Sequence, residues 1–249
     1  MYGVQTESTR RTEHARDLFA GLPETYDRMG ALLSFGQDPR WRRFMVSKVS
    51  VPRRGRVLDV ATGTGAVAIE LGRWTDADIV GLDQSEPMVR QGVERAARAG
   101  LGERIGFVLA QGERLPFPDE EFDGVTFTYL LRYVEDPAWT LAELARVLRI
   151  GGTLANLEFH VPPNPVWRAG WRLYTRGVIP VVGRLASRSW HEVGRFLGPS
   201  ISRFYARYPL EDQLGMWRAA GIRDVQARVM SLGGGVVVWG SKGGGSNAG

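Results

Sequence analysis

Short apolar runs alternate with helical segments from residue 56 onward, and this alternation limits the possible fold more than any other feature of the chain. The runs have the length of buried strands, and the segments between them carry apolar residues at helical spacing. Such a succession predicts an α/β fold whose sheet is doubly wound and mostly parallel. Seven strands are predicted, at 57–60, 79–82, 105–109, 124–128, 153–159, near 225 and at 236–239, with helices at 66–74, 87–99, 137–148 and 210–220.

Local signals predict where one of these helices begins and ends. Asp136 can accept hydrogen bonds from the free amides at the start of helix 137–148, and Pro137 suits its first position. Gly151 and Gly152 are predicted to stop the helix, after which the next strand begins.

The segments around this alternating core differ from it in composition. Residues 1–50 are predicted to form a helical lead-in or lid, with a charged amphipathic helix at 6–19. Residues 51–242 form the predicted main domain. Within it, 162–209 mixes prolines and glycines with aromatic residues, and we expect a cap inserted over the sheet edge. The Gly- and Ser-rich tail at 243–249 is predicted to be disordered.

The composition narrows the compartment and the chemistry. The chain has no cysteine, so disulfides and thiolate metal sites are excluded. The first 16 residues are polar and charged, and no apolar run reaches the length needed to span a membrane. We therefore expect a cytoplasmic protein that is soluble, or peripheral to the inner face of the membrane.

Basic residues are concentrated in one segment. The formal charge is +5, yet residues 164–208 alone contain eight arginines against a single acid, Glu192. The same segment is rich in tryptophan. Three interpretations remain open: a solvated face of the cap, a surface that docks on anionic lipid, and a nucleic-acid patch. Lipid docking is the favoured functional interpretation, because interfacial helices combine basic residues with tryptophan.

The strongest local signal is the sequence 57–65, an apolar strand that ends in an acid and opens through glycines into a helix. Gly63 and Gly65 let the backbone approach a ligand closely, although a merely structural turn is the alternative. Asp83 follows at the spacing of a ribose-binding acid in dinucleotide-binding folds. However, Asp59 would repel a pyrophosphate and attract a cationic amino-acid moiety. A zwitterionic sulfonium ligand therefore fits better than a nicotinamide dinucleotide.

Polar residues also follow the second and third predicted strands. Asp83 ends the second strand, where its carboxylate can accept hydrogen bonds from both ribose hydroxyls. The alternative role of Asp83 is a helix cap. Gln111, Gly112 and Glu113 follow the third strand, where the edge of an adenine would lie, and in isolation they would be an ordinary polar loop.

Several short motifs lie between residues 19 and 240. They are Tyr26-Asp27-Arg28-Met29, Leu33-Ser34-Phe35-Gly36, Leu58-Asp59 through Gly65, Gly81-Leu82-Asp83, Leu115-Pro116-Phe117-Pro118-Asp119, Leu131-Arg132, Arg146-Val147-Leu148, Gly151-Gly152 and Leu157-Glu158-Phe159. Together they resemble class I methyltransferases and, within these, the ubiquinone/menaquinone biosynthesis C-methyltransferase family. The first two motifs carry most of the family resemblance, because generic methyltransferases lack them.

This resemblance implies a Rossmann-like methyltransferase sheet and S-adenosylmethionine as the cofactor, with S-adenosylhomocysteine as its product. Carried over position by position, it assigns donor contacts to residues that follow the first four strands. These are Thr64, Asp83, Gln111, Gly112 and Thr128, with Gly63 and Gly65 forming the loop and Asp59, Gln84, Met88 and Glu113 completing the predicted site.

The resemblance also implies C-methylation of a prenylated quinol such as demethylmenaquinol. The family motif after the fourth strand ends in Leu-Arg-Asn, and Arg132 matches the arginine implicated in activating the quinol. Tyr133 replaces the asparagine, which leaves O- or N-methylation of another small metabolite as an alternative. Gln111 stands where the family has Asn or Asp, and Val237-Val238-Trp239 replaces a C-terminal Ala-Leu-His segment.

Methyl transfer is an in-line displacement at a carbon activated by positive sulfur, so the enzyme mainly aligns the reactants and excludes water. Arg132 is predicted to stabilise a developing phenolate, and Tyr26 to orient the acceptor ring. Arginine is a poor direct base because it stays charged. The alternative for Arg132 is a salt bridge to Glu135 or Asp136, and the alternative for Tyr26 is packing.

Tyr133 and His160 are the remaining candidate catalytic residues. His160 follows a predicted strand at its carboxyl end, a suitable place for a base, but it could equally hydrogen-bond backbone at the hinge of the cap. His14 and His191 are too isolated to predict a metal site. Two other classes remain as alternatives: a nicotinamide-dependent oxidoreductase, disfavoured by Asp59, and a noncatalytic lipid- or RNA-binding module.

Overall fold

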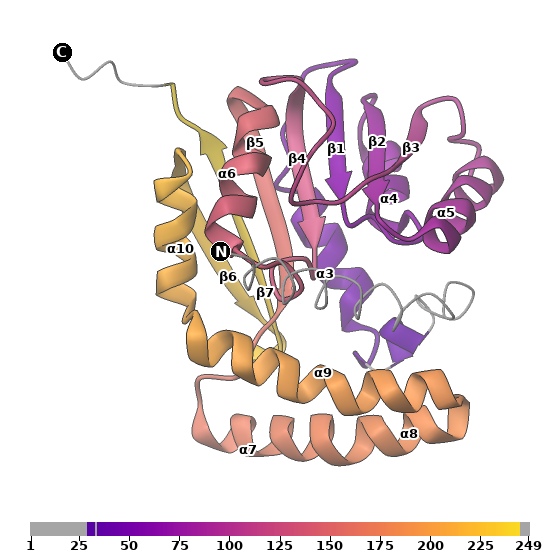
Figure 1. The fold of residues 1–249 in the computed structure, drawn as a ribbon, viewed down its shortest axis with the longest axis vertical. Helices are drawn as coiled ribbons and strands as arrows, with labels where there is room; N and C mark the ends of the chain where they lie inside the picture. Colours follow the sequence, from indigo (N-terminus) through magenta and orange to yellow (C-terminus); the bar gives the residue numbers. More distant parts are fainter. Residues whose placement is uncertain (1–28, 33, 245–249) are drawn as a thin grey trace, which may run out of the picture.

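Seven strands form one sheet in the computed structural model, which describes residues 29–32 and 34–244 (Figure 1). The strand order is β3-β2-β1-β4-β5-β7-β6. The first five strands run parallel, whereas β7 lies antiparallel between β5 and β6. The predicted α/β fold with a doubly wound, mostly parallel seven-stranded sheet is confirmed. The strands are β1 (Arg56–Val60), β2 (Asp78–Asp83), β3 (Ile105–Leu109), β4 (Phe122–Thr128), β5 (Leu148–Phe159), β6 (Ile222–Met230) and β7 (Gly235–Lys242).

Helices cover both faces of this sheet. One layer contains α3, α4 and α5, whose apolar residues join one buried cluster, and the other contains α6 and α10, which join a second. The helices are α3 (Gln37–Val46), α4 (Ala66–Trp74), α5 (Glu86–Arg98), α6 (Pro137–Val147), α7 (Pro165–Leu173), the π-helix η1 (Tyr174–Val178), α8 (Ile179–Ala186), α9 (Arg188–Arg207), α10 (Leu210–Ala219) and the 3-10 turn η2 (Ser231–Gly233).

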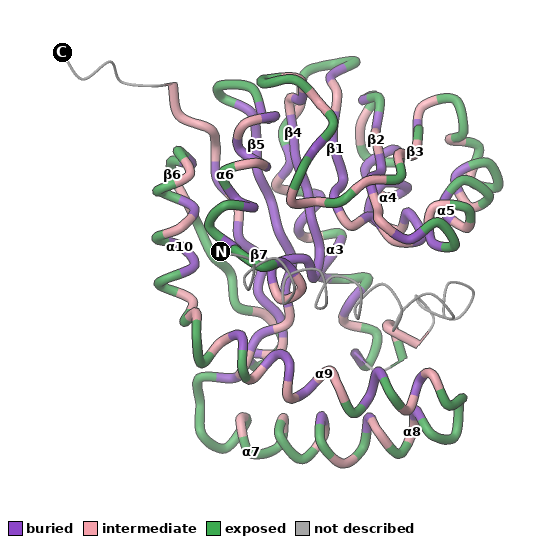
Figure 2. The backbone as a smooth tube through the Cα atoms, viewed as in Figure 1, coloured by how far each residue is buried: buried purple, intermediate pink, exposed green. Residues whose placement is uncertain are grey.

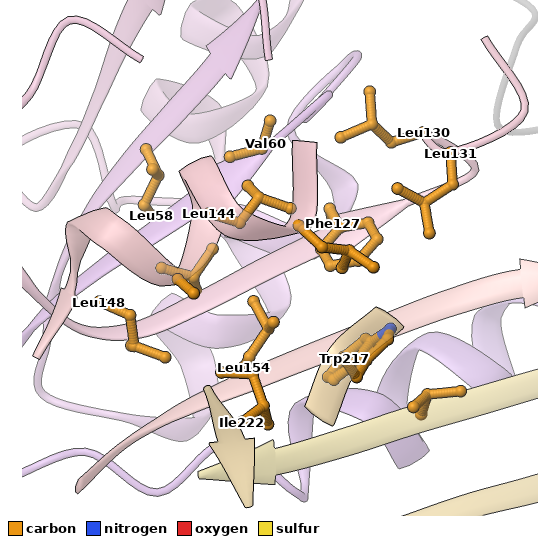
Figure 3. Packing of buried hydrophobic residues seen from close by; sticks show 14 of the residues in the cluster. Leu58, Val60, Phe127, Leu130, Leu131, Leu144, Leu148, Leu154, Trp217 and Ile222 are labelled. Atoms are coloured by element: carbon orange, nitrogen blue, oxygen red, sulfur yellow. The ribbon is translucent and has the colours of Figure 1, made fainter. Parts of the chain in front are cut away.

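The apolar runs of the sequence become strands that are buried on both sides, as expected for a parallel sheet between two helical layers. In β1, Val57 joins the cluster on the α3 and α4 side, whereas Leu58 and Val60 join the cluster on the α6 and α10 side. Figure 3 shows that second cluster, in which Phe127 stacks on Trp217 with ring centroids 6.0 Å apart. The sheet is therefore a rigid platform for residues at its strand ends.

The start of α6 follows the prediction, but its end does not. Asp136 Oδ1 accepts hydrogen bonds from the amides of Ala138 and Trp139, at 2.8 and 3.1 Å. The helix ends at Val147, and β5 begins at once, so Gly151 and Gly152 lie inside a strand and do not stop the helix. The register against β4 shifts near this stretch, where Gly151 has a φ of 79°. The two glycines therefore lie where the strand is irregular.

The helices α7 to α9 form a hairpin that lies across the end of the sheet to which the parallel strands point (Figure 1). The two arms approach closely because glycines lie between them. A Cβ atom on Gly183 would stand 2.4 Å from the carbonyl oxygen of Trp190, and one on Gly198 would stand 2.8 Å from Cβ of Thr175. Figure 2 shows α9 partly buried and α7 largely exposed. The predicted helix at 6–19 and Tyr26 lie outside the described residues.

Candidate active site

A cavity opens at the carboxyl ends of β1 to β4, and we call it the strand-end cavity. Ten residues that the sequence placed in the active site line it. They are Gly63, Thr64, Asp83, Gln84, Met88, Gln111, Gly112, Glu113, Thr128 and Tyr133. Asp59 and Gly65 are not in this wall, and they support it from below.

Asp59 holds the loop after β1 in place. Its carboxylate is almost fully buried and accepts hydrogen bonds from Thr62 Oγ1 at 2.6 Å and from Thr126 Oγ1 at 2.7 Å. Burial raises the pKa of Asp59 to about 6, although the two hydroxyl donors oppose the shift. Gly65 begins α4 with a φ of 76°, and a Cβ there would lie 3.0 Å from the ring of Phe107. Asp59 therefore acts on a ligand through the loop that it fixes.

Asp83 stands at the end of β2 and ties two loops together. Its Oδ2 accepts the amide of Gly63 at 2.8 Å, and its Oδ1 accepts the amide of Ser85 at 2.9 Å. Burial raises its pKa, and these backbone donors oppose the rise. The N-cap of α5 is Ser85, so Asp83 fixes the loop before this helix and does not cap the helix itself. Since each carboxylate oxygen has two lone pairs, Asp83 can still accept hydrogen bonds from a ligand's hydroxyl groups.

The loop after β3 closes the far side of the strand-end cavity. A Cβ atom on Gly112 would stand 2.9 Å from Cγ1 of Val60, so only glycine lets this loop lie against β1. The Glu113 carboxylate accepts the amide of Glu135 at 2.8 Å and is therefore used within the protein. Gln111 remains in the wall, where its amide can meet the edge of a base.

A second cavity of about 450 Å³ lies between the sheet and the α7 to α9 hairpin, and we call it the cap cavity. Its wall is largely aromatic and aliphatic, and it includes residues from α3, β5 and the hairpin. The two cavities share three wall residues, Arg42, Tyr129 and Tyr133. The two cavities therefore adjoin, and ligands bound in them would meet beside these three side chains.

Arg132 lies in the wall of the cap cavity, and its ion pair differs from the predicted alternative. Its Nε lies 2.9 Å from Oε1 of Glu158, with both side chains 1% exposed. The predicted partners were Glu135 and Asp136. The structure places Glu158 there because β5 runs beside β4, which brings the two strand ends together. The guanidinium is thus held at a fixed position in a buried site.

Tyr133 lies at the boundary of the two cavities. Its Oη accepts a hydrogen bond from Arg132 Nη1 at 3.2 Å, and its ring stacks on Phe196 of α9. Burial raises the pKa of Tyr133, so the hydroxyl stays protonated at neutral pH. The Arg132 guanidinium also lies 4.7 Å from the centre of the Tyr133 ring. The cap and the arginine therefore both orient this phenol.

His160 makes a hydrogen bond to the protein backbone. Its Nδ1 lies 3.0 Å from the carbonyl oxygen of Gly233, and its ring packs edge-on against Tyr205. Burial lowers its pKa. His160 lies outside the described walls of both cavities, whereas the preceding residue, Phe159, lines the cap cavity. This geometry matches the hydrogen-bonding alternative for His160.

Comparisons with known proteins agree with this geometry. Residues 6–242 match the model of the ubiE/COQ5 methyltransferase family. The chain belongs to the ubiE/COQ5 methyltransferase family. It is 38% identical over 237 residues to the ubiquinone/menaquinone biosynthesis C-methyltransferase UbiE of Geobacter sulfurreducens, covering 94% of this chain and 91% of that protein. It is 35% identical over 235 residues to the demethylmenaquinone methyltransferase of Roseiflexus castenholzii, covering 94% and 95%.

Solved structures show the same fold at low sequence identity. A SAM-dependent methyltransferase from Aquifex aeolicus superposes with a TM-score of 0.56 at 19% identity, over 81% of this chain and 89% of that one. The [4+2]-cyclase SpnF superposes equally well, with a TM-score of 0.56 at 18% identity, over 83% and 81%. The fold alone thus accommodates different reactions, and for this chain it is family membership that identifies a methyltransferase.

S-adenosylmethionine is the cofactor of this ubiE/COQ5 family member, and the strand-end cavity fits it. Gly63 exposes its backbone to open space, since a Cβ there would meet no atom within 4 Å. Ser85 Oγ is buried with no hydrogen-bond partner among the described residues, and it lies in the wall. Ser85 was not predicted as a site residue, although its position directly before α5 was a usable signal. Arg42 also lines the cavity without having been predicted, because no local pattern pointed to a ligand there.

Proposed function

We propose that this chain transfers the methyl group of S-adenosylmethionine to a ring carbon of a prenylated quinol, such as demethylmenaquinol. The observation that carries the proposal is that a strand-end cavity with acidic, hydroxyl and amide side chains adjoins a largely apolar cap cavity. A flat aromatic ring with an apolar tail matches the lining of the cap cavity, which includes Trp171, Trp190 and Phe159. The names of the curated relatives support the same acceptor class.

The donor, when bound, supplies a methyl group on a positively charged sulfur that a carbon nucleophile can displace. The ring carbon of a quinol becomes nucleophilic when the neighbouring hydroxyl loses its proton. Arg132 lies in the cap-cavity wall and is fixed by Glu158, so its charge is arranged in advance to stabilise the phenolate. Tyr133 remains a phenol and can donate a hydrogen bond to the same oxygen. Because arginine stays charged, Arg132 stabilises the phenolate and does not itself take the proton.

The test is methyl transfer from labelled donor into a reduced lipid-quinone extract in detergent, followed by mass analysis of the product. We expect one labelled methyl group on a quinone ring. Arg132→Lys keeps the charge but loses the planar fork, so we expect its turnover to fall while donor binding stays normal. Donor binding without labelled quinone would refute the quinol acceptor and leave the methyltransferase intact. Label on a quinol oxygen would favour the O-methylation that Tyr133 leaves open.

We further propose that the cap docks on an anionic lipid surface, where such a quinol resides. The outer arm of the hairpin is formed by α7, η1 and α8. It exposes large apolar side chains, among them Leu173 at 73%, Val181 at 60% and Leu185 at 83% exposed. Arg172, Arg176 and Arg184 are exposed on the same arm. Within the described residues, the helices are all too short or too polar to cross a bilayer. Apolar side chains flanked by arginines are typical of a helix that lies in the membrane interface.

The cap cavity reaches this same surface. Trp167 lines the cavity and is also 49% exposed on α7, so it stands at an opening of the cavity. A ring could therefore enter from the lipid side while its prenyl tail remains in the bilayer. On this proposal the enzyme works as a peripheral protein at the inner face of the membrane.

Co-sedimentation with vesicles tests the docking surface. We expect binding to vesicles of phosphatidylglycerol and phosphatidylcholine, weakened about fivefold for each arginine removed and weakened further by salt. Leu185→Asp should abolish binding, whereas Ile150→Asp, equally an exposed apolar site but on β5, should not. Equal binding of both variants would contradict the proposal. Competition by RNA would favour the nucleic-acid alternative.

A further inference from the structure

Arg42 is placed where the strand-end cavity needs a positive charge. Among the described residues that line this cavity, it alone carries a full positive charge, and the wall also contains the acids Asp83 and Glu113. Arg42 is 9% exposed, so its charge lies away from bulk water. It extends from α3, a helix fixed to the far end of the sheet by the hydrogen bond from Trp41 Nε1 to Ser231 Oγ at 2.9 Å. Arg42 is therefore a preorganised cation in a ligand-sized space.

The position of Arg42 along the cavity follows from the strand order. Gln111 follows β3, Asp83 ends β2, Thr64 follows β1 and Thr128 ends β4, so the cavity runs across these four strands in that order. The next residue after β4, Tyr129, donates its hydroxyl proton to Asp38 Oδ1 at 2.5 Å. Since Asp38 lies one turn before Arg42 on α3, the arginine lies at the β4 end, opposite the Gln111 loop.

One further contact agrees with this placement. Asp38 Oδ2 lies 2.8 Å from Arg42 Nε, so one carboxylate holds both the arginine and Tyr129. Tyr129 has a φ of 57°, an uncommon backbone conformation for a tyrosine, and it lies in the wall that the two cavities share. The charge of Arg42 also reaches the Asp59 carboxyl below the loop, where it opposes the rise in pKa caused by burial.

We propose that Arg42 binds the α-carboxylate of the methionyl part of the donor, and that Asp38 is the positioning residue that holds Arg42 there. The ribose at Asp83 and the adenine near Gln111 leave the β1 and β4 end for the amino-acid part. Among the described residues that line this cavity, Arg42 is the cation that can pair with a carboxylate at this end, and an unpaired charge in a partly buried site is unfavourable. A guanidinium carries five N–H donors in a planar fork, so it can hold a ligand carboxylate beside Asp38.

This inference rests on the donor assignment and is independent of the quinol. The competing interpretation is that Arg42 only fixes α3 to the sheet. A ligand series separates the two, because S-adenosylhomocysteine has the carboxylate, decarboxylated S-adenosylmethionine keeps the amine but lacks it, and 5′-methylthioadenosine lacks both. Calorimetric titration of each ligand into the full chain gives the dissociation constants.

For Arg42→Gln we expect the dissociation constant of S-adenosylhomocysteine to rise about 10- to 100-fold, as for loss of a charge-assisted hydrogen-bonded pair. The constants for the two ligands without a carboxylate should change by less than about twofold. Arg42→Lys should lie between, because it keeps the charge but loses the fork. Asp38→Asn should also raise the dissociation constant of S-adenosylhomocysteine, by a smaller factor than Arg42→Gln. Arg43 is an exposed arginine on the same helix. Arg43→Gln is therefore the matched control, and it should leave all three dissociation constants unchanged.

An equal loss for all three ligands in Arg42→Gln would show a structural role and overturn the inference. Unchanged binding of S-adenosylhomocysteine would overturn it as well. The unmodified chain provides a test that does not depend on a variant folding: it should bind S-adenosylhomocysteine at least tenfold more tightly than 5′-methylthioadenosine. None of these titrations contains a quinol, so failure of the proposed acceptor would leave their outcome unaffected.

Discussion

The strand-end cavity and the cap cavity share a wall but are built in different ways. The first consists of loops that each follow a strand, and these loops are held by threonine hydroxyls that donate to Asp59 and by backbone amides that donate to Asp83. The second consists largely of side chains from a helical hairpin that faces the sheet, and Arg132 in its wall is held by the buried Glu158. A site of the first kind tolerates little change, whereas the second can be altered side chain by side chain to suit another acceptor.

Substitution of Asp83 should have the largest effect, and it should act on the strand-end cavity first. Asp83→Ala removes the predicted ribose contacts and the acceptor for the Gly63 amide. We expect donor binding to weaken by about two to four orders of magnitude, since each hydrogen bond to a charged group contributes roughly 1.5–3 kcal/mol. Calorimetric titration measures this. Asp78→Ala, at the exposed start of β2, is the control, and comparable losses in both variants would contradict the assignment.

Glu158→Gln tests the cap cavity in the same way. Removing one charge of a buried ion pair leaves Arg132 uncompensated, which typically destabilises a protein by about 3–5 kcal/mol. Denaturant unfolding should show this loss, and acceptor turnover should fall. Donor affinity should stay within about twofold, because Glu158 lies outside the strand-end wall. A large loss of donor affinity in a folded variant would mean that the two cavities are not separable.

The pKa of Asp59 gives the strand-end region a pH dependence of its own. Burial raises this pKa from 3.8 to about 6, so between these values the folded state holds a proton that the unfolded state has released. The stability of the unmodified chain relative to Asp59→Asn should therefore fall as pH rises from about 4 to 6 and level off above. The total difference is roughly 3 kcal/mol. Denaturant unfolding of both proteins across this range measures it, and a flat difference would disprove the shift.

Gly183→Ala should have the smallest effect, and it should be confined to the cap. The added methyl would meet the Trp190 carbonyl oxygen at 2.4 Å and force α8 away from α9. Overpacking of this kind costs about 1–3 kcal/mol. We expect a raised KM for the acceptor with unchanged donor affinity, as measured by steady-state kinetics and titration. Gly215→Ala on α10, where a Cβ would meet no atom within 4 Å and which lies outside both cavity walls, should leave both values unchanged.

The difference between the two cavities also explains which parts of the site could be predicted from the sequence. The alternating runs predict the sheet, and the loops after β1 to β3 could be assigned because each polar residue lies next to the strand that positions it. The partner of Arg132 is 26 residues away and that of Tyr129 is 91 residues away, so no local pattern reveals either pair. Gly151 and Gly152 were misread because a helix end and a strand bend both use glycine, and only the pairing with β4 distinguishes them.

The most direct test of the account uses a single purified acceptor, a reduced demethylated naphthoquinol whose reactive ring carbon carries deuterium. After incubation with S-adenosylmethionine, mass analysis shows whether the product has kept the deuterium. C-methylation predicts a methylated product that has lost it, because the new carbon–carbon bond replaces the carbon–deuterium bond at the ring carbon and the deuteron leaves. A methylated product that retains deuterium would contradict it, since the methyl group would then be on oxygen.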